Sequence, residues 1–229
     1  MSRFPTLPND DLGLSRRVPA DPVEALRKRM YWDRFYSDPD PKENLPLTTT
    51  ELASIRRHVL RPGMTTAVDV GSGWGVLTTA LAREGLRTTG YDWSPVAVEQ
   101  ARELWSEPQL SFEVHDFLTD NAPRALVPGS VDVLACRLVL PYLDVQRFMT
   151  DARRWVRPYT GVVYVVVQVW ERQPEGYFRG YPNSVIEGLR EGWRHSERWD
   201  LDWSGEFTAL VLTGPYGTEK RVHPAPTIH

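Results

Sequence analysis

The chain has 229 residues, a formal net charge of −3 at pH 7 and a single cysteine. A chain of this length can form one α/β domain that buries roughly 70% of its unfolded surface without disulfides or a structural metal. The acidic balance argues against general nucleic-acid binding, and the lone cysteine excludes an internal disulfide and fits a reducing compartment.

The beginning of the chain and its apolar runs predict a cytoplasmic protein with no membrane partner. Residues 1–20 are rich in Pro, Asp and Arg, which predicts a flexible N-terminal segment. The first residues lack the apolar core of a signal peptide, and the longest apolar run, 161–167, is too short to cross a bilayer.

Two helices are predicted ahead of the main α/β region. The first spans 22–36, with Pro at its first position, and ends at the breaker-rich stretch 37–41. The second spans 48–60 and ends before a Pro-Gly pair. We interpret residues 21–62 as a helical lid or cover.

Strands and helices then alternate over 63–214, which predicts a parallel sheet closed by a hairpin with an antiparallel strand. Residues 215–229 are predicted to be a C-terminal tail. The predicted strands are 66–70, 86–91, 110–114, 131–136, 161–169, 197–203 and 206–212, and the predicted helices are 75–84, 94–104, 144–156 and 187–193.

The glycine-rich motif Asp69-Val70-Gly71-Ser72-Gly73-Trp74-Gly75 follows the first predicted strand. Glycines let the backbone touch a ligand where a Cβ would clash. The second strand is followed by Asp92, at the spacing of an acid that accepts hydrogen bonds from a ribose diol. The order of strand, glycine turn, helix, strand and acid is typical of a nucleotide-binding βαβ unit. Val76 stands where the dinucleotide fingerprint needs glycine, and a phosphate loop with Gly-Lys-Ser or Gly-Lys-Thr is missing.

The motif resembles motif I, Asp-x-Gly-x-Gly-x-Gly, of the class I S-adenosylmethionine (SAM) methyltransferases. The similarity is good over 64–168, fair for the final hairpin, and weak before 45 and between 170 and 195. The resemblance implies an α/β, Rossmann-like three-layer α/β/α sandwich. Its seven-stranded, mostly parallel sheet would have the order 3-2-1-4-5-7-6 with an antiparallel C-terminal hairpin, and its cofactor would be SAM.

The resemblance also assigns roles at the ends of the first two strands. Asp69, with the turn of Gly71, Ser72 and Gly73, would hold the methionyl part of SAM, although Asp69 could instead satisfy N–H groups of that turn. The acid Asp92 would bind the ribose, or it could cap the next helix.

Three further cofactor contacts are expected, each with a simpler alternative. Trp93 would lie against adenine, or be a half-buried surface aromatic. Asp116 and Phe117 would contact the adenine ring, with Asp116 a plain turn residue as the alternative. Cys136 would lie near the sulfonium, although a cysteine here is more often a small core residue.

Arg137 is expected to meet an anionic or carbonyl group of the acceptor, with a salt bridge to Asp144 or to the loop before it as the equal alternative. Because Cys136 stands where related catechol enzymes have a metal-binding acid, no metal is predicted. No general base is identified: His115 should point to the opposite face of its strand end, and Pro141 replaces a histidine of many relatives in the resembling family.

The acceptor pocket is expected to come from the two aromatic-rich segments that match the family poorly. From the first helix, Tyr31 and Trp32 would contact the acceptor and Tyr36 the cofactor, and Tyr177 would contribute from 170–182. Aromatic rings suit an apolar acceptor and attract a sulfonium, although for any single ring a packing role in the covering helix or loop is the better prediction.

The favoured function is therefore SAM-dependent methylation of a small molecule, aromatic or carboxylate-bearing, by a monomer or homodimer. One alternative is a SAM-binding protein of this fold without methyl transfer, acting as a regulatory or interaction subunit. A protein or RNA methyltransferase is disfavoured by acidity and by the lack of an appended binding domain. A nicotinamide oxidoreductase is disfavoured by Val76.

Overall fold

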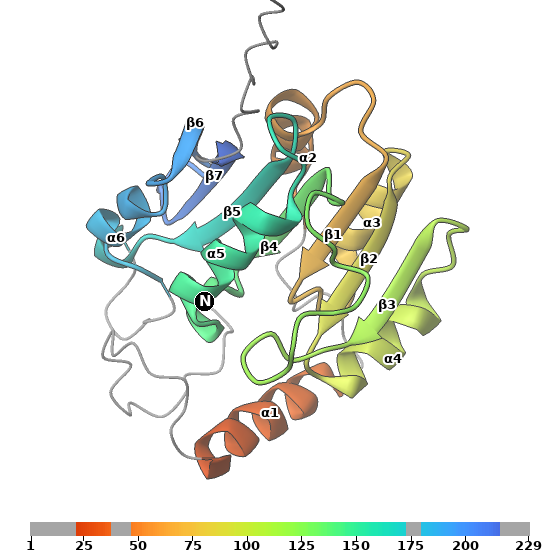
Figure 1. Ribbon diagram of the computed structural model, residues 1–229. Helices are drawn as coiled ribbons and strands as arrows, with labels where there is room; N and C mark the ends of the chain where they lie inside the picture. Colours follow the sequence, from red (N-terminus) through yellow and green to blue (C-terminus); the bar gives the residue numbers. More distant parts are fainter. Residues whose placement is uncertain (1–21, 38–46, 173–179, 216–229) are drawn as a thin grey trace, which may run out of the picture.

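The computed structural model describes residues 22–37, 47–172 and 180–215, with side chains from residue 29 onward in the first helix. Its centre is a seven-stranded sheet of order β3-β2-β1-β4-β5-β7-β6 (Figure 1), which confirms the predicted order and fold class. Neighbouring strands from β3 to β5 pair in parallel, whereas β7 pairs antiparallel with both β5 and β6. The strands are β1 (Thr66–Val70), β2 (Arg87–Asp92), β3 (Leu110–Val114), β4 (Val133–Arg137), β5 (Val162–Gln168), β6 (Trp193–Asp200) and β7 (Phe207–Pro215).

The central strands are apolar and β-branched because helices cover both of their faces. Strand β5 reads Val-Val-Tyr-Val-Val-Val-Gln and is buried up to its last residue. In β1, Val68 pairs with Thr89 on one side and with Leu134 on the other. Continuous apolar runs of this kind are typical of parallel strands in the middle of an α/β sandwich.

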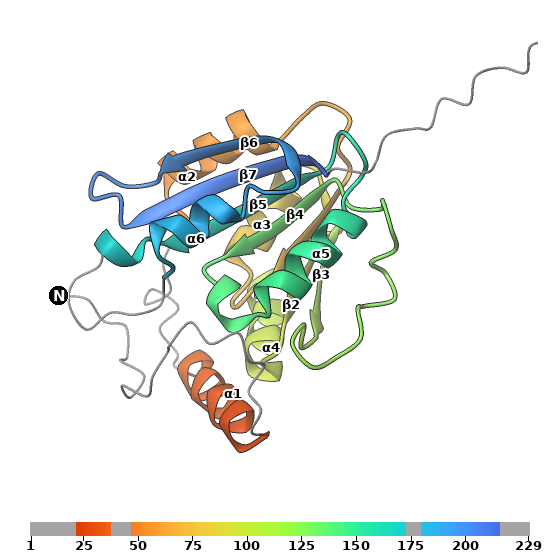
Figure 2. The same ribbon diagram turned by 60° about the vertical axis from the view of Figure 1, so that its left-hand side comes forward.

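The helices form two layers and one cover (Figure 2). Helices α2, α3 and α4 pack on one face of the sheet, and α5 and α6 on the other. Helix α1 lies beyond the carboxyl ends of the central strands and contacts α4. The helices are α1 (Pro22–Tyr36), α2 (Thr49–Ser54), continued by a π-helical turn (Ile55–Val59), α3 (Val76–Arg83), α4 (Pro95–Leu104), α5 (Val145–Trp155) and α6 (Asn183–Gly188), with 3₁₀ turns at Leu140–Tyr142 and Trp170–Arg172.

Local sequence signals fix where the helices behind the site begin. The Ser94 hydroxyl accepts a hydrogen bond from the N–H of Ala97 at 3.2 Å, and Pro95 occupies the first turn of α4. Asp144 caps α5 by accepting from the N–H of Arg147 at 3.1 Å. Such caps each contribute about 1 kcal/mol and set the direction in which the chain enters the helix.

The prediction of a helix over 187–193 is wrong. Helix α6 ends at Gly188, and β6 begins at Trp193, whose side chain is 4% exposed and packs in the core. Gly192 has a φ of +81°, so the backbone turns sharply just before the strand. The closing hairpin is consequently longer than predicted and its first strand starts earlier in the sequence.

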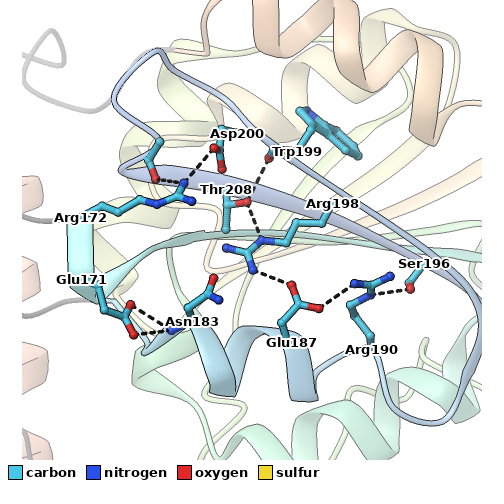
Figure 3. Close-up of polar contacts among 11 residues, drawn as sticks. Glu171, Arg172, Asn183, Glu187, Arg190, Ser196, Arg198, Trp199, Asp200 and Thr208 are labelled. Atoms are coloured by element: carbon cyan, nitrogen blue, oxygen red, sulfur yellow. Dashed lines mark hydrogen bonds and ion pairs between the residues drawn. The ribbon is translucent and has the colours of Figure 1, made fainter.

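Charged side chains fasten this hairpin to its surroundings (Figure 3). Arg198 donates to Glu187 of α6 at 2.7 Å and to Thr208 of β7 at 3.0 Å. Arg172 donates to Asp200 of β6 at 2.8 Å and to the carbonyl of Gly205 at 3.1 Å. Each exposed pair contributes little alone, but together they fix the position of the hairpin beside β5.

Within the described ranges, no helix combines the length and the apolar character needed to cross a membrane.

Candidate active site

A cavity of about 150 Å³ opens at the carboxyl ends of the parallel strands. Its walls come from the glycine turn after β1, the ends of β2, β3 and β4, the turn 138–143, and α1. Open α/β sheets bind their ligands at this edge, where connections leave neighbouring strands in opposite directions. We refer to this cavity as the cleft.

The glycine turn requires glycine for two separate reasons. Gly71 and Gly73 have φ values of +72° and +51°, in the left-handed region. A Cβ on Gly71 would also lie 2.4 Å from Val139, and one on Gly73 would lie 2.9 Å from the Tyr36 hydroxyl oxygen. Beside them, the buried hydroxyl of Ser72 has no hydrogen-bond partner within the described part of the chain. The turn thus offers backbone and a free hydroxyl to the cleft.

Asp69 is a buried carboxylate at the base of this turn. Its side chain is 2% exposed and accepts a hydrogen bond from the Thr78 hydroxyl at 2.7 Å. Burial, with a smaller contribution from nearby Asp92, raises the pKa of Asp69 to about 7 against the opposing effects of Thr78 and Arg137. A buried carboxylate bonded to a hydroxyl instead of a cation favours a positively charged ligand group.

Asp92 ends β2 and faces the same cavity. It accepts hydrogen bonds from the N–H groups of Gly73 and Ser94, both at 2.9 Å, and is 4% exposed. Burial raises the pKa of Asp92 to about 6. Because Ser94 caps α4, Asp92 does not serve as that cap. A carboxylate has about four acceptor positions, so two remain for a ligand hydroxyl pair.

Helix α1 is attached to the loop that follows Asp92. The Arg29 guanidinium donates two hydrogen bonds to the carbonyl of Trp93, and the Asp33 carboxylate accepts from the Ser94 hydroxyl. Trp93 itself lines the cleft. Helix α1 is therefore attached directly to the loop beside Asp92, the acid that is expected to bind the ribose.

Aromatic rings from α1 close the cleft on the side away from the sheet. Trp32 stacks on Tyr36, with centroids 5.7 Å apart, and meets Tyr142 edge-on at 5.5 Å. Phe35 stacks on Trp74 of the glycine turn at 5.5 Å. Burial raises the pKa of the Tyr36 phenol well above its usual value, and the nearby Asp92, Tyr142 and Asp69 add to the shift.

At the end of β3, Asp116 and Phe117 line the cleft, and their contact with adenine stays a prediction. Asp116 also shapes a turn. Its carboxylate accepts from the N–H of Leu118 at 2.8 Å. The expectation that His115 faces away is wrong, since His115 lines the cleft. Strand alternation ends where the chain turns, so it does not fix the direction of this side chain. Burial lowers the pKa of His115.

Two buried polar atoms beside this turn have no partner in the described ranges: Nε2 of His115 and the hydroxyl of Tyr91. The two rings lie 5.9 Å apart, and both residues line the cleft. Buried polar groups are normally hydrogen-bonded, so these atoms are further candidates for ligand contacts.

At the end of β4, Arg137 lines the cleft but binds a partner from α2. Its guanidinium donates to both carboxylate oxygens of Glu51, at 2.9 and 3.0 Å. The Tyr164 hydroxyl donates to the same carboxylate at 3.2 Å. Arg137 thus pairs with Glu51, a partner that the sequence did not indicate, and Asp144 caps α5.

Cys136, next to Arg137, is fully buried and does not line the cleft, which corrects the prediction of a cofactor contact. Successive side chains of β4 point to opposite faces, so Cys136 packs in the core with α5 and α6. Burial raises the pKa of its thiol well above the usual value. The simpler alternative, a small core residue, describes it.

The predicted acceptor residues are divided in the structure. Trp32 lines the cleft, whereas Tyr31 packs edge-on against Trp32 at 5.5 Å and lies outside the lining. Tyr177 lies outside the described residues. The sequence did not indicate Tyr142, which lies in an irregular turn, or Gln168, although Gln168 is the single polar residue that ends the apolar run of β5.

In the part of the chain that the structure describes, no group of three or more His, Cys, Asp or Glu side chains is arranged to hold a metal ion. The absence of a metal requirement stays a prediction.

The fold and the cleft define a Rossmann-like α/β protein with a nucleotide-binding site at the carboxyl edge of its sheet. Residues 68–164 match the family described as methyltransferase domain. This match, together with the fold and the cleft, supports the class I SAM-dependent type of methyltransferase, whose cofactor is SAM.

Curated relatives agree with this assignment. The ubiquinone biosynthesis O-methyltransferase of Xanthomonas campestris pv. campestris is 34% identical over 125 residues, covering 54% of this chain and 49% of that protein. The protein of the same name from Pseudomonas putida is 30% identical over 160 residues, covering 67% of this chain and 63% of that protein. The chain spans about half the length of the Xanthomonas relative that it matches.

Solved structures show the same fold. The phosphoethanolamine N-methyltransferase 1 of Haemonchus contortus superposes with a TM-score of 0.66 at 19% identity, over 86% of this chain and 50% of that one. A TehB-like SAM-dependent methyltransferase from Corynebacterium glutamicum superposes with a TM-score of 0.54 at 16% identity, over 85% of this chain and all of the other.

Proposed function

We propose that the protein transfers a methyl group from SAM to a neutral, aromatic small molecule, with a hydroxyl oxygen as the acceptor atom. One observation carries the proposal: the glycine turn with Asp69 and Asp92 opens into the same cavity as the aromatic rings of α1. The acceptor oxygen is supported by the printed name of the relatives, ubiquinone biosynthesis O-methyltransferase.

The cleft residues fit SAM. Asp69 would bind its ammonium group, Asp92 its ribose hydroxyls and the free hydroxyl of Ser72 its carboxylate, while Asp116 and Phe117 would contact adenine. The glycine turn, with Gly71, Ser72 and Gly73 on the wall of the cleft, would bring its backbone close to the methionyl part. SAM would supply a methyl group already activated by its sulfonium.

The remaining task of the protein is positioning. Holding two reactants in line at near-attack distance can supply roughly 7–11 kcal/mol at the extreme. The rings of Trp32, Phe35 and Tyr36 exclude water from the reacting atoms and pack against a flat acceptor. His115 adjoins Asp116 at the proposed adenine end, so it is not placed to take a proton from the acceptor.

Pairing of Arg137 favours a neutral acceptor over a carboxylate-bearing one. Among the described residues that line the cleft, the guanidinium of Arg137 is the cationic group. Its Nε and Nη2 groups both donate hydrogen bonds to the carboxylate of Glu51 on α2. An acceptor carboxylate would have to compete with this buried pair, which costs several kcal/mol to break.

Binding and turnover measurements test the proposal in sequence. Isothermal titration should show binding of SAM and S-adenosylhomocysteine (SAH) and none of NADH. Methyl-labelled SAM should then label members of a panel of phenols, with amines and carboxylates as comparison sets and Asp92→Ala as the inactive control.

Three results would count against it. Binding of NADH without SAM would refute the cofactor. Binding of SAM without labelling of any panel member would favour the alternative of a non-catalytic SAM-binding subunit. Labelling confined to amines or carboxylates would refute the acceptor class.

A further inference from the structure

The strand ends divide the cleft into two halves. Asp69, Asp92 and Asp116, which are expected to contact SAM, lie at or next to the ends of β1, β2 and β3, whereas Gln168 ends β5. Three strand spacings separate β2 from β5 in the sheet, which corresponds to about 14 Å. We call the wall formed by Gln168, the end of β4 and the turn 138–143 the acceptor half, because it lies away from the expected ribose acid.

The acceptor half is largely apolar. Its described lining residues are Arg137, Leu138, Val139, Tyr142, Leu143 and Gln168. The guanidinium of Arg137 can only donate hydrogen bonds, and two of its donors bind Glu51. The amide of Gln168 contains an oxygen that accepts hydrogen bonds and a nitrogen that donates them. The orientation of this amide therefore decides which kind of polar group a substrate can present to it.

Glu206 fixes the orientation of the Gln168 amide. The Nε2 group of Gln168 donates a hydrogen bond to Oε1 of Glu206 at 3.1 Å. Because a carboxylate offers only acceptors, the exchanged orientation would bring two oxygen atoms together. Glu206 is held in turn by its backbone, since its N–H donates to the Ser204 hydroxyl at 3.2 Å and its carbonyl accepts from the N–H of Val169 at 2.8 Å.

The hairpin that carries Glu206 is itself fastened beside the cleft. Arg172 donates to the carbonyl of Gly205, the preceding residue, at 3.1 Å (Figure 3). With Nε2 held on this side, Oε1 of Gln168 is turned away from Glu206, and no donor binds it within the described ranges. Gln168 and Glu206 are both half-buried. A partly desolvated acceptor atom of this kind favours a ligand group that donates a hydrogen bond.

We propose that Gln168, oriented by Glu206, selects the methyl acceptor: Oε1 of Gln168 accepts a hydrogen bond from the hydroxyl group that is to be methylated. This inference rests on the proposed function, because it requires a hydroxyl acceptor. Gln168 is then a residue that determines specificity, and Glu206 is a positioning residue that acts through it.

The same contact distinguishes the substrate from its product. During transfer the S–CH₃ bond of SAM breaks as the O–CH₃ bond forms, and the hydroxyl proton passes to solvent water, because an amide oxygen is too weak a base to keep it. The product is an ether and has no O–H group to donate. Oε1 of Gln168 would therefore lose its partner when the product occupies the acceptor half, which weakens product binding.

The size of the effect follows from the cost of an unpaired acceptor. Leaving a buried polar atom without its hydrogen bond typically changes affinity by about 5- to 100-fold. Because Gln168 is half-buried, water can partly replace the lost donor, which places the effect at about 5- to 15-fold.

The test titrates the SAH complex of the protein with β-naphthol, a flat phenol, and with its methyl ether. These two ligands differ in the O–H group and also in bulk, so the ratio of their affinities is compared between the wild type and Gln168→Leu. The substitution removes the amide and keeps a side chain of similar size. The preference for β-naphthol over the ether should fall by about 5- to 15-fold in Gln168→Leu.

Three further variants complete the comparison. Glu206→Leu should also lower the preference, because the released Gln168 amide can rotate and donate to the ether oxygen. Gln168→Asn keeps an amide on a shorter side chain and should lose most of the preference. Gln109→Leu is the matched control and should keep it: Gln109 is also half-buried and donates from Nε2 to the carbonyl of Ala82 at 2.7 Å, outside the cleft. All variants should bind SAH as the wild type does.

Each contrary result has a separate meaning. An unchanged preference in Gln168→Leu, equal weakening of both ligands, or binding of neither ligand to the wild-type SAH complex would overturn the inference. An unchanged preference in Glu206→Leu would overturn the role of Glu206. Labelling of β-naphthol by methyl-labelled SAM, with an unchanged preference in Gln168→Leu, would overturn this inference and leave the proposed function standing. A wild type that binds neither SAM nor SAH would refute both.

Discussion

Removing the carboxylate of Glu51 should strongly destabilise the protein, because it would leave the Arg137 guanidinium without its anion at a site with little access to water. Glu51 is 2% exposed as a residue and the Arg137 side chain 16%, and two hydrogen bonds of 2.9 and 3.0 Å join them. Breaking a buried pair by removing one partner typically costs about 3–5 kcal/mol. The partial exposure of Arg137 places Glu51→Ala near the lower limit, at about 3 kcal/mol.

Urea denaturation followed by tryptophan fluorescence measures this loss, and a thermal scan should show a midpoint lower by about 6–12 °C for a domain of this size. Glu51→Gln keeps an oxygen acceptor for Arg137 and for Tyr164, so its loss should be smaller. Glu107→Ala is the matched control: Glu107 pairs with Arg83 at 2.8 Å on the surface, where such pairs contribute under about 1 kcal/mol.

The double variant Glu51→Ala/Arg137→Ala completes a thermodynamic cycle. Because the two residues contact each other, the cycle should show a coupling free energy of about 1–3 kcal/mol. Two results would refute the view that this pair stabilises the contact between α2 and the end of β4. One is that the losses of unfolding free energy in the two single variants simply add in the double variant. The other is that Glu51→Ala loses no more unfolding free energy than Glu107→Ala.

Four further predictions concern the cleft and the sheet. Asp92→Ala should cost about 2–4 kcal/mol of SAM binding free energy, measured by titration, and unchanged affinity would refute the ribose assignment. Asp69→Asn should make the ligand-free protein a few kcal/mol more stable at pH 8. The pKa of the Asp69 carboxyl in the folded protein is raised to about 7, so its ionisation disfavours folding as pH rises through that value. The gain in stability should vanish near pH 4, and a pH-independent difference in unfolding free energy would contradict the assignment. Asp132 behaves oppositely, because hydrogen bonds from Thr65 and Thr66 outweigh burial and hold its pKa below the usual value. Asp132→Asn should therefore be less stable than the wild type at pH 7 and match it once pH falls through the pKa of the folded state. Urea titrations at several pH values measure this difference. If α1 is a lid, its amides should exchange quickly in the free protein and gain protection with SAH; strong protection in both states would identify a fixed brace.

The features that could be predicted from sequence are those encoded by neighbours along the chain. The run Thr66–Val70, the glycines after it and Asp92 lie within one βαβ unit, and local sterics and hydrogen bonding determine how they fold. Helix α4 begins where Ser94 and Pro95 predicted. The positions of Gly71, Gly73 and Asp92 on the cleft follow directly from that unit.

The features that could not be predicted depend on contacts between distant segments. Nothing near Arg137 in the sequence indicates that its partner is Glu51, which lies 86 positions earlier in the chain. The same holds for the packing of Tyr142 on Trp32. His115 shows a second limit. The alternation of side chains predicts direction only inside a strand, and this residue follows the last residue of β3.

Because Cys136 is buried, the rate at which a reagent modifies its thiol can report how often the surrounding core opens. The thiol is fully shielded and its raised pKa keeps it in the unreactive, protonated form, so a thiol reagent must wait for β4 to become accessible. As the sequence has no other cysteine, every modification event reports motion at one known position in the core. The rate of labelling, with and without ligand, would therefore measure how often the sheet beneath the cleft opens, without any probe having to be introduced.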